Sequence, residues 1–95
     1  MRLRLSPQAE RDIVGLHEFG SLTYGVQQAD LYLDQLIMTL ASVEAMPLMM
    51  RERDVVRPPV RIAVHRAHQI FYRIEGEYVW IIRILHHSAN WRDLV

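Results

Sequence analysis

The chain has 95 residues, which is enough for one domain with a modest core and too few for a second domain. Its 51% hydrophobic and 23% charged residues are ordinary for a globular protein, and no apolar run approaches the roughly 20 residues needed to cross a bilayer. The absence of cysteine excludes disulfides and thiolate metal sites. No signal peptide is expected, because the amino end reads directly as a strand. We therefore expect a single cytoplasmic domain over residues 1–95, without membrane contact.

The charge is unevenly placed, although the formal net charge is zero and all eleven basic residues are arginine. Residues 1–45 hold three arginines and six acids, whereas residues 46–95 hold eight arginines and five acids. A GC-rich genome would explain arginine in place of lysine, but not this distribution. Because the arginine fork suits both carboxylates and phosphates, the second half is predicted to meet an anionic partner.

The first predicted elements are a strand and a helix. Leucine and arginine alternate over residues 2–5, which indicates a short strand. Ser6 then has the place of a helix cap and Pro7 that of the first helical residue, with Asp12 among the acids near the positive end of the helix dipole. We expect this helix over residues 7–20.

Two glycines enclose the segment 20–25, which is predicted to be the turn of a helical hairpin. The second helix carries one apolar seam with spacings of three and four, formed by Val26, Ala29, Leu33, Leu36, Leu40 and Val43. Pro47 is predicted to end this helix, and residues 48–59 to form a loop. A coiled coil is the alternative use of such a seam, but the seam is short and the strands that follow need a cover.

Three apolar runs after the loop predict three antiparallel strands, whose side chains alternate between two faces. The two helices are expected to cover one face, through the seam together with Ile13, Leu16 and Phe19. That face is predicted to carry Leu3, Val60, Tyr72 and Trp80. The other face is predicted to stay open and to carry Arg2, Arg4, Arg61, Phe71, Arg73, Val79, Ile81, Arg83 and Leu85. The fold class is therefore α+β, in the order β-α-α-β-β-β, with a helical hairpin on one face of a small, mostly antiparallel sheet.

The chain resembles the RelE/ParE superfamily of bacterial toxins from type II toxin–antitoxin pairs, and within it the ParE-like branch. The resemblance covers nearly the whole chain and rests on residues 5–13 (LSPQAERDI), Gln28-Ala29, residues 68–73 (HQIFYR), residues 82–86 (IRILH) and Trp91. It implies an inhibitor of DNA gyrase rather than an enzyme. It also implies a co-expressed ParD-like antitoxin with a ribbon-helix-helix DNA-binding head, so that DNA would be met only through the antitoxin or gyrase.

The open face is the predicted antitoxin surface, because arginines could meet acidic side chains while apolar positions take hydrophobic anchors. Its predicted contacts are Arg61, Phe71, Arg73, Val79, Ile81, Arg83 and Leu85. The surface that touches the target is less defined, and Trp91 and Arg92 in the tail are the candidates. With Tyr72 and Trp80 expected under the helices, only Phe71 would remain to stack nucleic-acid bases, which argues against such binding.

Two other functions stay open. A ribosome-dependent messenger-RNA endoribonuclease of RelE type would use His87 for proton transfer and Arg83 as the cation. Gln69 stands where such nucleases carry a basic residue, and the chain has no lysine for the catalytic set of other members. A degenerate relative that only pairs with its antitoxin is the third reading. No cofactor is expected, and no metal either, since His68 and His86 are expected to be packed or hydrogen-bonded while His65 and His87 lie near the surface.

Overall fold

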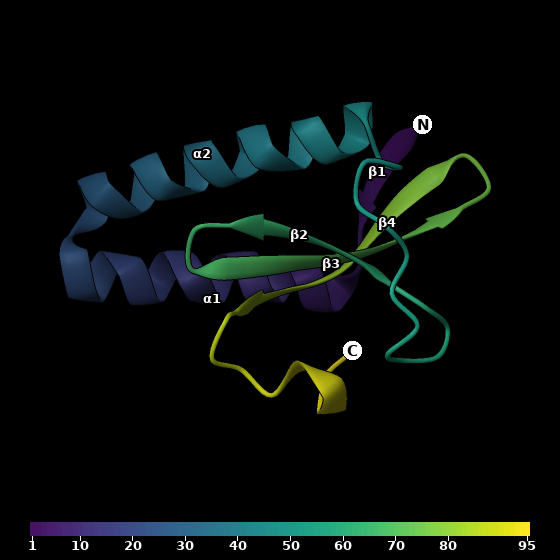
Figure 1. The fold of residues 1–95 in the computed structure, drawn as a ribbon. Helices are drawn as coiled ribbons and strands as arrows, with labels where there is room; N and C mark the ends of the chain where they lie inside the picture. Colours follow the sequence, from purple (N-terminus) through teal and green to yellow (C-terminus); the bar gives the residue numbers. More distant parts are fainter.

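A computed structural model describes all 95 residues and confirms the predicted order of elements (Figure 1). The elements are β1 (Arg2–Leu5), α1 (Pro7–Tyr24), α2 (Val26–Ala45), β2 (Arg61–His65), β3 (His68–Glu75), β4 (Tyr78–His86) and a short 3-10 turn, η1 (Trp91–Asp93). The two helices form a hairpin against one face of a single sheet. No helix is long and apolar enough to cross a membrane.

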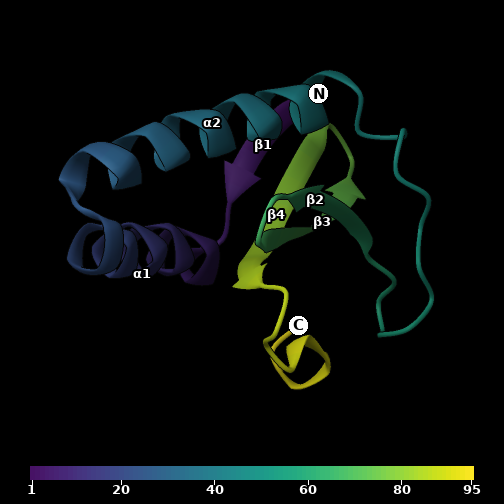
Figure 2. The same cartoon turned by 60° about the vertical axis from the view of Figure 1, so that its left-hand side comes forward.

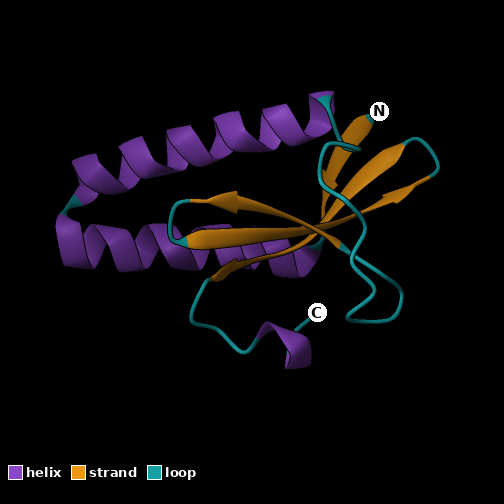
Figure 3. Cartoon of the chain, viewed as in Figure 1, coloured by secondary structure: helices purple, strands orange, loops and turns teal.

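The four strands lie in the order β1-β4-β3-β2, so the first strand joins the sheet beside the last (Figure 3). β1 is parallel to β4, and the other neighbours are antiparallel. Arg66 (φ 52°) and Ala67 make the tight turn between β2 and β3, and Gly76 (φ 58°) lies in the turn between β3 and β4. These pairings place β4 in the interior of the sheet, between the first strand of the chain and β3.

The start of α1 is as predicted, but its end is not. The Ser6 hydroxyl accepts a hydrogen bond from the Ala9 N–H at 2.9 Å, which confirms the cap. The helix runs through Gly20 to Tyr24, and the chain turns only at Gly25, where φ is 95°. A Cβ added at Gly20 would lie 3.4 Å from the Cβ of Ala29, so this glycine allows close approach of the helices rather than a turn.

The seam of α2 is buried at Ala29, Leu36, Leu40 and Val43, and the helix ends just before Pro47 as expected. Val26, however, is 59% exposed, and Phe19 on α1 is 65% exposed. Both were expected against the sheet. The reason is geometric, because the connected end of the hairpin extends away from the strands (Figure 2).

A bulge in β4 corrects the predicted faces of this strand. Tyr72 pairs with Ile81 whereas Phe71 pairs with Arg83, so Ile82 is the extra residue. Val79 and Ile81 are therefore fully buried beneath the helices, together with Ile84 beyond the bulge. The expectation that Val79 and Ile81 lie on the open face is wrong. Trp80, expected under the helices, points to the opposite side, which we call the far face.

The faces of β2 also differ from the prediction. Arg61 pairs with Tyr72, and Ala63 with Ile70, so these residues share the helix side of the sheet. Val60 consequently belongs to the far face, where it joins a second apolar cluster. One phase of this run is apolar, with Val60, Ile62 and Val64, and the sheet turns that phase toward the second cluster rather than toward the helices. Because both faces of the sheet are covered here, the more apolar phase need not be the one beneath the helices.

The far face is partly covered by the chain itself. Its buried cluster consists of Val60, Ile62, Phe71 and Leu85, and it is flanked by Val56, Ile82, Ala89, Trp91 and Val95. The loop before β2 and the C-terminal segment thus supply a second cover, with the loop visible on the side away from the helices (Figure 2). The expectation that Phe71 and Leu85 lie open is wrong, since both are buried.

Candidate functional site

A carboxylate–guanidinium junction ties α1 to the second half of β4. Asp12 accepts from Arg83 Nε at 2.8 Å and from Arg83 Nη2 at 2.9 Å, and one of its oxygens also accepts from the Ile84 backbone N–H at 2.9 Å. The two side chains are only 12% and 19% exposed. Hydrogen bonding to Asp12 raises the pKa of Arg83 further above its ordinary value. The guanidinium is thus permanently charged and already engaged.

This junction forms where β4 has lost a neighbour. β1 ends at Leu5, opposite Ile81, so the edge of β4 beyond that point has no adjacent strand. The Ser6 hydroxyl donates to the Ile82 carbonyl at 2.7 Å, and the Asp12 carboxylate accepts from the Ile84 N–H farther along the same edge. The first turns of α1 therefore close the edge with side chains, which protects it from pairing with another strand.

The C-terminal segment packs on the far face through Trp91. The ring of Trp91 lies 5.3 Å from that of Phe71, and the Arg92 guanidinium lies 4.6 Å from the centroid of the Trp91 ring. Arg83 Nη1 donates to the Leu94 carbonyl at 3.4 Å. Trp91 is thus largely a cover for the sheet, whereas Arg92 remains exposed and available to a partner.

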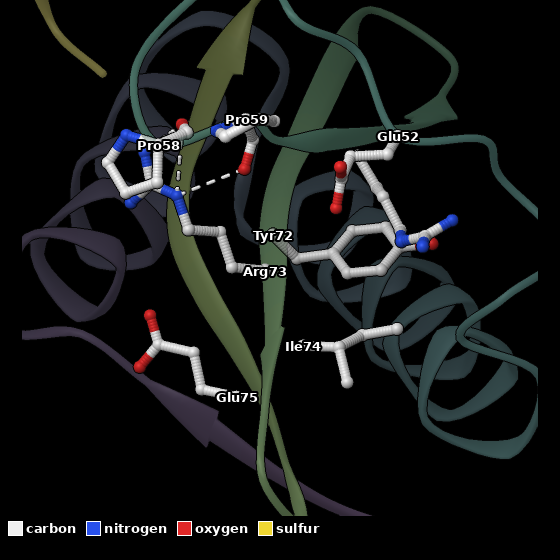
Figure 4. Close-up of a pocket in the computed structure, with 8 residues that line it drawn as sticks. Glu52, Pro58, Pro59, Tyr72, Arg73, Ile74 and Glu75 are labelled. Carbon is white, nitrogen blue, oxygen red and sulfur yellow. Dashed lines mark hydrogen bonds between the residues drawn. The ribbon is translucent and has the colours of Figure 1, made fainter.

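A small pocket lies where β3 extends beyond β2, and we call it the arginine pocket (Figure 4). Its lining residues are Glu52, Pro58, Pro59, Arg61, Tyr72, Arg73, Ile74 and Glu75. Residues 73–75 pair with β4 on one side and have no strand on the other, because β2 begins opposite Tyr72. The pocket therefore combines an open strand edge with two guanidinium groups.

Both arginines of the pocket are held by backbone carbonyls rather than by carboxylates. Arg73 Nη2 donates to the Pro58 carbonyl at 2.8 Å and its Nε to the Pro59 carbonyl at 3.2 Å, as the dashed lines to Arg73 in Figure 4 indicate. Arg61 Nη1 donates to the Met50 carbonyl at 2.5 Å. Neither takes part in any of the ion pairs of the protein, so their positive charge is oriented but not neutralised.

Histidines gather at the other end of the β2–β3 hairpin, beneath α2. Thr39 Oγ1 lies 2.7 Å from His65 Nδ1, and the Tyr32 hydroxyl lies 2.6 Å from His68 Nδ1. His65 is buried, contrary to expectation, because α2 covers this end of the sheet, and its Nε2 has no hydrogen-bond partner. His86 is exposed at the end of β4, and its Nδ1 lies 2.7 Å from the Ser88 hydroxyl, so it is hydrogen-bonded rather than packed.

Burial lowers the pKa of both covered histidines. For His65 the cause is chiefly loss of solvent, with the charge of Arg66 acting in the same direction. For His68 the pKa is lowered by burial first and then by the neighbouring histidines, and only Asp12 opposes the shift. These side chains do not combine with carboxylates into a group of three or more that could hold a metal ion.

Comparison with known proteins decides the family. Residues 3–91 match the family described as the ParE toxin of the type II toxin–antitoxin system parDE. The chain belongs to the ParE toxin family. It is 34% identical over 89 residues to Toxin ParE1 of Caulobacter vibrioides and 33% identical over 90 residues to Toxin ParE1 of Mycobacterium tuberculosis, in each case over 94% of this chain and 92% of the relative.

The fold is also that of a solved ParE-related structure. A chain described as the chromosomal ParDE TA system from P. aeruginosa superposes with a TM-score of 0.80. The match covers 90% of this chain and 95% of that chain, at 18% sequence identity. The helical hairpin on a mixed sheet is thus an arrangement that ParE toxins and this structure share.

The structure separates the residues that the sequence grouped as the antitoxin surface of this ParE toxin. Phe71, Val79, Ile81 and Leu85 are buried in two different clusters, on opposite sides of the sheet. Arg83 is bound to Asp12. Of the predicted set, only Arg61 and Arg73 line an accessible place, the arginine pocket, which they reach from opposite faces of the sheet.

The residues of the nuclease alternative are not assembled. His87 is exposed in the turn after β4, where its ring lies 4.3 Å from that of His86, while Arg83 is oriented by Asp12. Sequence interpretation did not find the role of Asp12, for which it proposed only a favourable interaction with the helix dipole. Its partner is 71 residues away, and no local pattern marks such a pair.

Proposed function

We propose that this ParE toxin arrests growth in the cytoplasm by inhibiting DNA gyrase, and that a co-expressed ParD-like antitoxin with a ribbon-helix-helix head neutralises it. The observation that carries this proposal is the family match over residues 3–91, which extends from the first strand to the C-terminal segment. The toxin–antitoxin naming of the P. aeruginosa structure supports the pairing with an antitoxin.

Inhibition by binding, rather than cleavage, is supported by the state of Arg83. A nuclease needs a cation aimed at the phosphate that develops charge in the transition state. The Arg83 guanidinium instead donates hydrogen bonds to both carboxylate oxygens of Asp12. Loss of a positioned acid or base typically lowers a rate by about 100- to 10,000-fold, so a lone exposed His87 would be a poor catalyst.

For the antitoxin we propose the arginine pocket as the principal polar contact. An acidic segment of the antitoxin would place carboxylates against Arg61 and Arg73, whose charges are not neutralised by this chain. An extended segment could also pair with the open edge of β3 at residues 73–75, with main-chain hydrogen bonds adding affinity. Glu52 and Glu75 at the rim would repel acids that are out of register, which favours one alignment.

Controlled expression tests the proposed target. A gyrase inhibitor should induce the DNA damage response and filamentous cells while translation continues, and purified toxin should inhibit gyrase supercoiling. His87→Ala should leave growth arrest unchanged. A halt of translation before any DNA damage, abolished by His87→Ala in a folded protein, would instead assign the RelE-type nuclease. Absence of both effects would identify a relative that only pairs with its antitoxin.

The pocket is tested separately by calorimetry with the antitoxin encoded beside this chain. Arg61→Glu should weaken binding by more than tenfold, because it places a carboxylate against an acidic segment. Arg11→Glu, which makes the same charge change on the exposed surface of α1, serves as the control and should change affinity by less than threefold. Equal affinities of the two variants would refute the pocket as the contact and leave the family function untouched.

Arg92 is the remaining candidate for a contact with the target. It is exposed and lies over the ring of Trp91, which in turn packs on Phe71. We propose that Arg92→Glu reduces growth arrest while antitoxin affinity stays within threefold. A variant that arrests growth like the parent protein would remove Arg92 from the target surface.

A further inference from the structure

One part of the far face remains uncovered, beside β1. On the adjoining halves of β1 and β4, Arg4 lies opposite Trp80 and Arg2 opposite Tyr78. Neither Tyr78 nor Trp80 belongs to the second apolar cluster or to the residues packed against it, and Arg2 and Arg4 are exposed. We call Arg2, Arg4, Tyr78 and Trp80 the Trp80 platform.

The platform joins aromatic rings to unpaired positive charge. The rings of Tyr78 and Trp80 are half-buried, with centroids 6.2 Å apart, and the Arg4 guanidinium lies 5.0 Å from the centroid of Tyr78. Arg2 and Arg4 are exposed and belong to none of the ion pairs. On β3, Arg73 lies opposite Trp80 and Glu75 opposite Tyr78, so the surface around the rings carries three positive charges and one negative charge.

We propose that the Trp80 platform binds single-stranded nucleic acid. Two aromatic side chains at alternate positions of one strand stand side by side on a sheet, where successive unpaired bases can stack on them. Arginines on the neighbouring strands flank the rings, because adjacent strands lie about 4.8 Å apart. These arginines can bind the phosphates on either side of the stacked bases. The proposal revises the expectation that DNA is met only through a partner, because Trp80 faces away from the helices.

The composition of the platform favours this ligand over an acidic peptide. A peptide carboxylate would be satisfied by the arginines alone and has no planar group to place on the rings. Duplex DNA keeps its bases stacked on each other and would reach only the arginines. Two aromatic rings inclined at 50° to each other, with arginine charge beside them, fit a ligand that carries planar groups and negative charge along its length. The proposal rests on the geometry of this surface and not on the proposed inhibition of gyrase.

Fluorescence anisotropy with labelled 15-residue oligo-dT and oligo-U tests the proposal on the full-length protein. At low salt the platform should bind one or both with a dissociation constant in the micromolar range that is typical of non-specific binding, roughly 1–100 µM. The dT and U arms determine whether DNA or RNA is preferred. A duplex of the same length should bind at least fivefold more weakly.

Two sets of variants separate the contribution of base stacking from that of charge. Trp80→Leu keeps an apolar side chain but removes the indole, and should weaken binding by about fivefold or more, whereas Trp80→Phe should stay within about twofold. The double variant Arg2→Gln/Arg4→Gln should reduce the slope of log affinity against log salt by about 1.4, since each phosphate contact contributes about 0.7. Arg11→Gln/Arg66→Gln carries the same charge change away from the platform and should leave the slope unchanged.

Three results would overturn the proposal. The first is no binding of either oligonucleotide at 100 µM protein in 50 mM salt. The second is an equal effect of the two double arginine variants, which would indicate general charge attraction. The third is binding of a deca-glutamate peptide that Trp80→Leu weakens while neither oligonucleotide binds, which would assign the surface to an acidic protein segment. Circular dichroism of every variant verifies that the fold is retained.

Discussion

The two halves of β4 belong to one strand but have very different surroundings. Before the bulge, residues 78–81 lie between β1 and β3 and leave their aromatic side chains uncovered on the far face. After the bulge, residues 83–86 have β3 on one side only, Asp12 closes the other edge, and the C-terminal segment packs over Leu85. One half thus leaves part of its surface exposed, whereas the other half is tied to α1 and to the C-terminal segment.

The bulge at Ile82 makes this difference possible. The helices require Val79, Ile81 and Ile84 on their side, a spacing of two and then three. Strict alternation cannot supply that spacing, and one extra residue can. The same extra residue keeps Trp80, Arg83 and Leu85 together on the far face, although their positions in the sequence differ in parity.

The largest effect is expected from moving the register of β4. Deletion of Ile84 would turn Leu85 toward the helices and remove a buried side chain, which should cost more than about 4 kcal/mol and prevent stable folding. Deletion of Ile82 removes only the bulge and leaves every other side chain on its face, so it should cost about 1–2 kcal/mol. Urea unfolding monitored by circular dichroism measures both.

The opposite ranking would contradict the assigned register. If the chain without Ile84 folded and the chain without Ile82 did not, the strand would have to pair in another way. Deletion of Asn90, in the exposed segment after β4, is a control for chain shortening and should have less effect than either.

The order of elements was predictable from the sequence because local signals specify it. The Ser6 cap, the seam of α2 and the three apolar runs each depend on residues close in the chain, and each was found as predicted. The faces of the strands were not predictable in the same way. β4 is apolar on both sides, and nothing near Ile82 marks it as an extra residue.

Removal of the Asp12 carboxylate is expected to have the next largest effect. Asp12→Ala leaves Arg83 charged and half-enclosed and leaves the Ile84 N–H without its acceptor, so it should destabilise the protein by about 3 kcal/mol. Asp12→Asn, which can still accept from the Ile84 N–H, should lower the free energy of unfolding by less. Asp34→Ala on the exposed side of α2 is the control, and a loss from Asp12→Ala as small as from this variant would contradict the role of the junction.

Truncation of Trp91 should have a smaller effect. Trp91→Ala removes a half-buried ring from Phe71 and uncovers part of the second cluster, which should cost about 2 kcal/mol, less than for a fully buried tryptophan. Leu94→Ala in the same segment should change the free energy of unfolding by less than about 0.5 kcal/mol. If Trp91→Ala costs no more than Leu94→Ala, the tail does not cover the far face in solution.

The candidate site was only partly predictable. Arg61 and Arg73 were expected at a partner surface and do line an accessible pocket, because arginine on a short strand near a loop rarely packs inside. The position of Arg83 depends on Asp12 in another element, and that of Trp80 on the bulge. Contacts between residues far apart in the chain determine both positions, so composition and the alternation of side chains could not predict them.

The smallest expected effect concerns pH at the histidines beneath α2. Because burial lowers the pKa of His65 and His68 in the folded protein, the unfolded chain binds more protons below its ordinary histidine pKa of about 6.5. The stability that the neutral rings contribute is fully present above pH 6.5 and is lost as the pH falls toward the lowered values. Urea midpoints at pH 7.5 and 5.0 should therefore differ more in the parent protein than in the double variant His65→Gln/His68→Gln. Carboxylates titrate alike in both proteins and cancel in this comparison. A pH dependence that the double variant retains in full would place its origin in groups other than these two histidines.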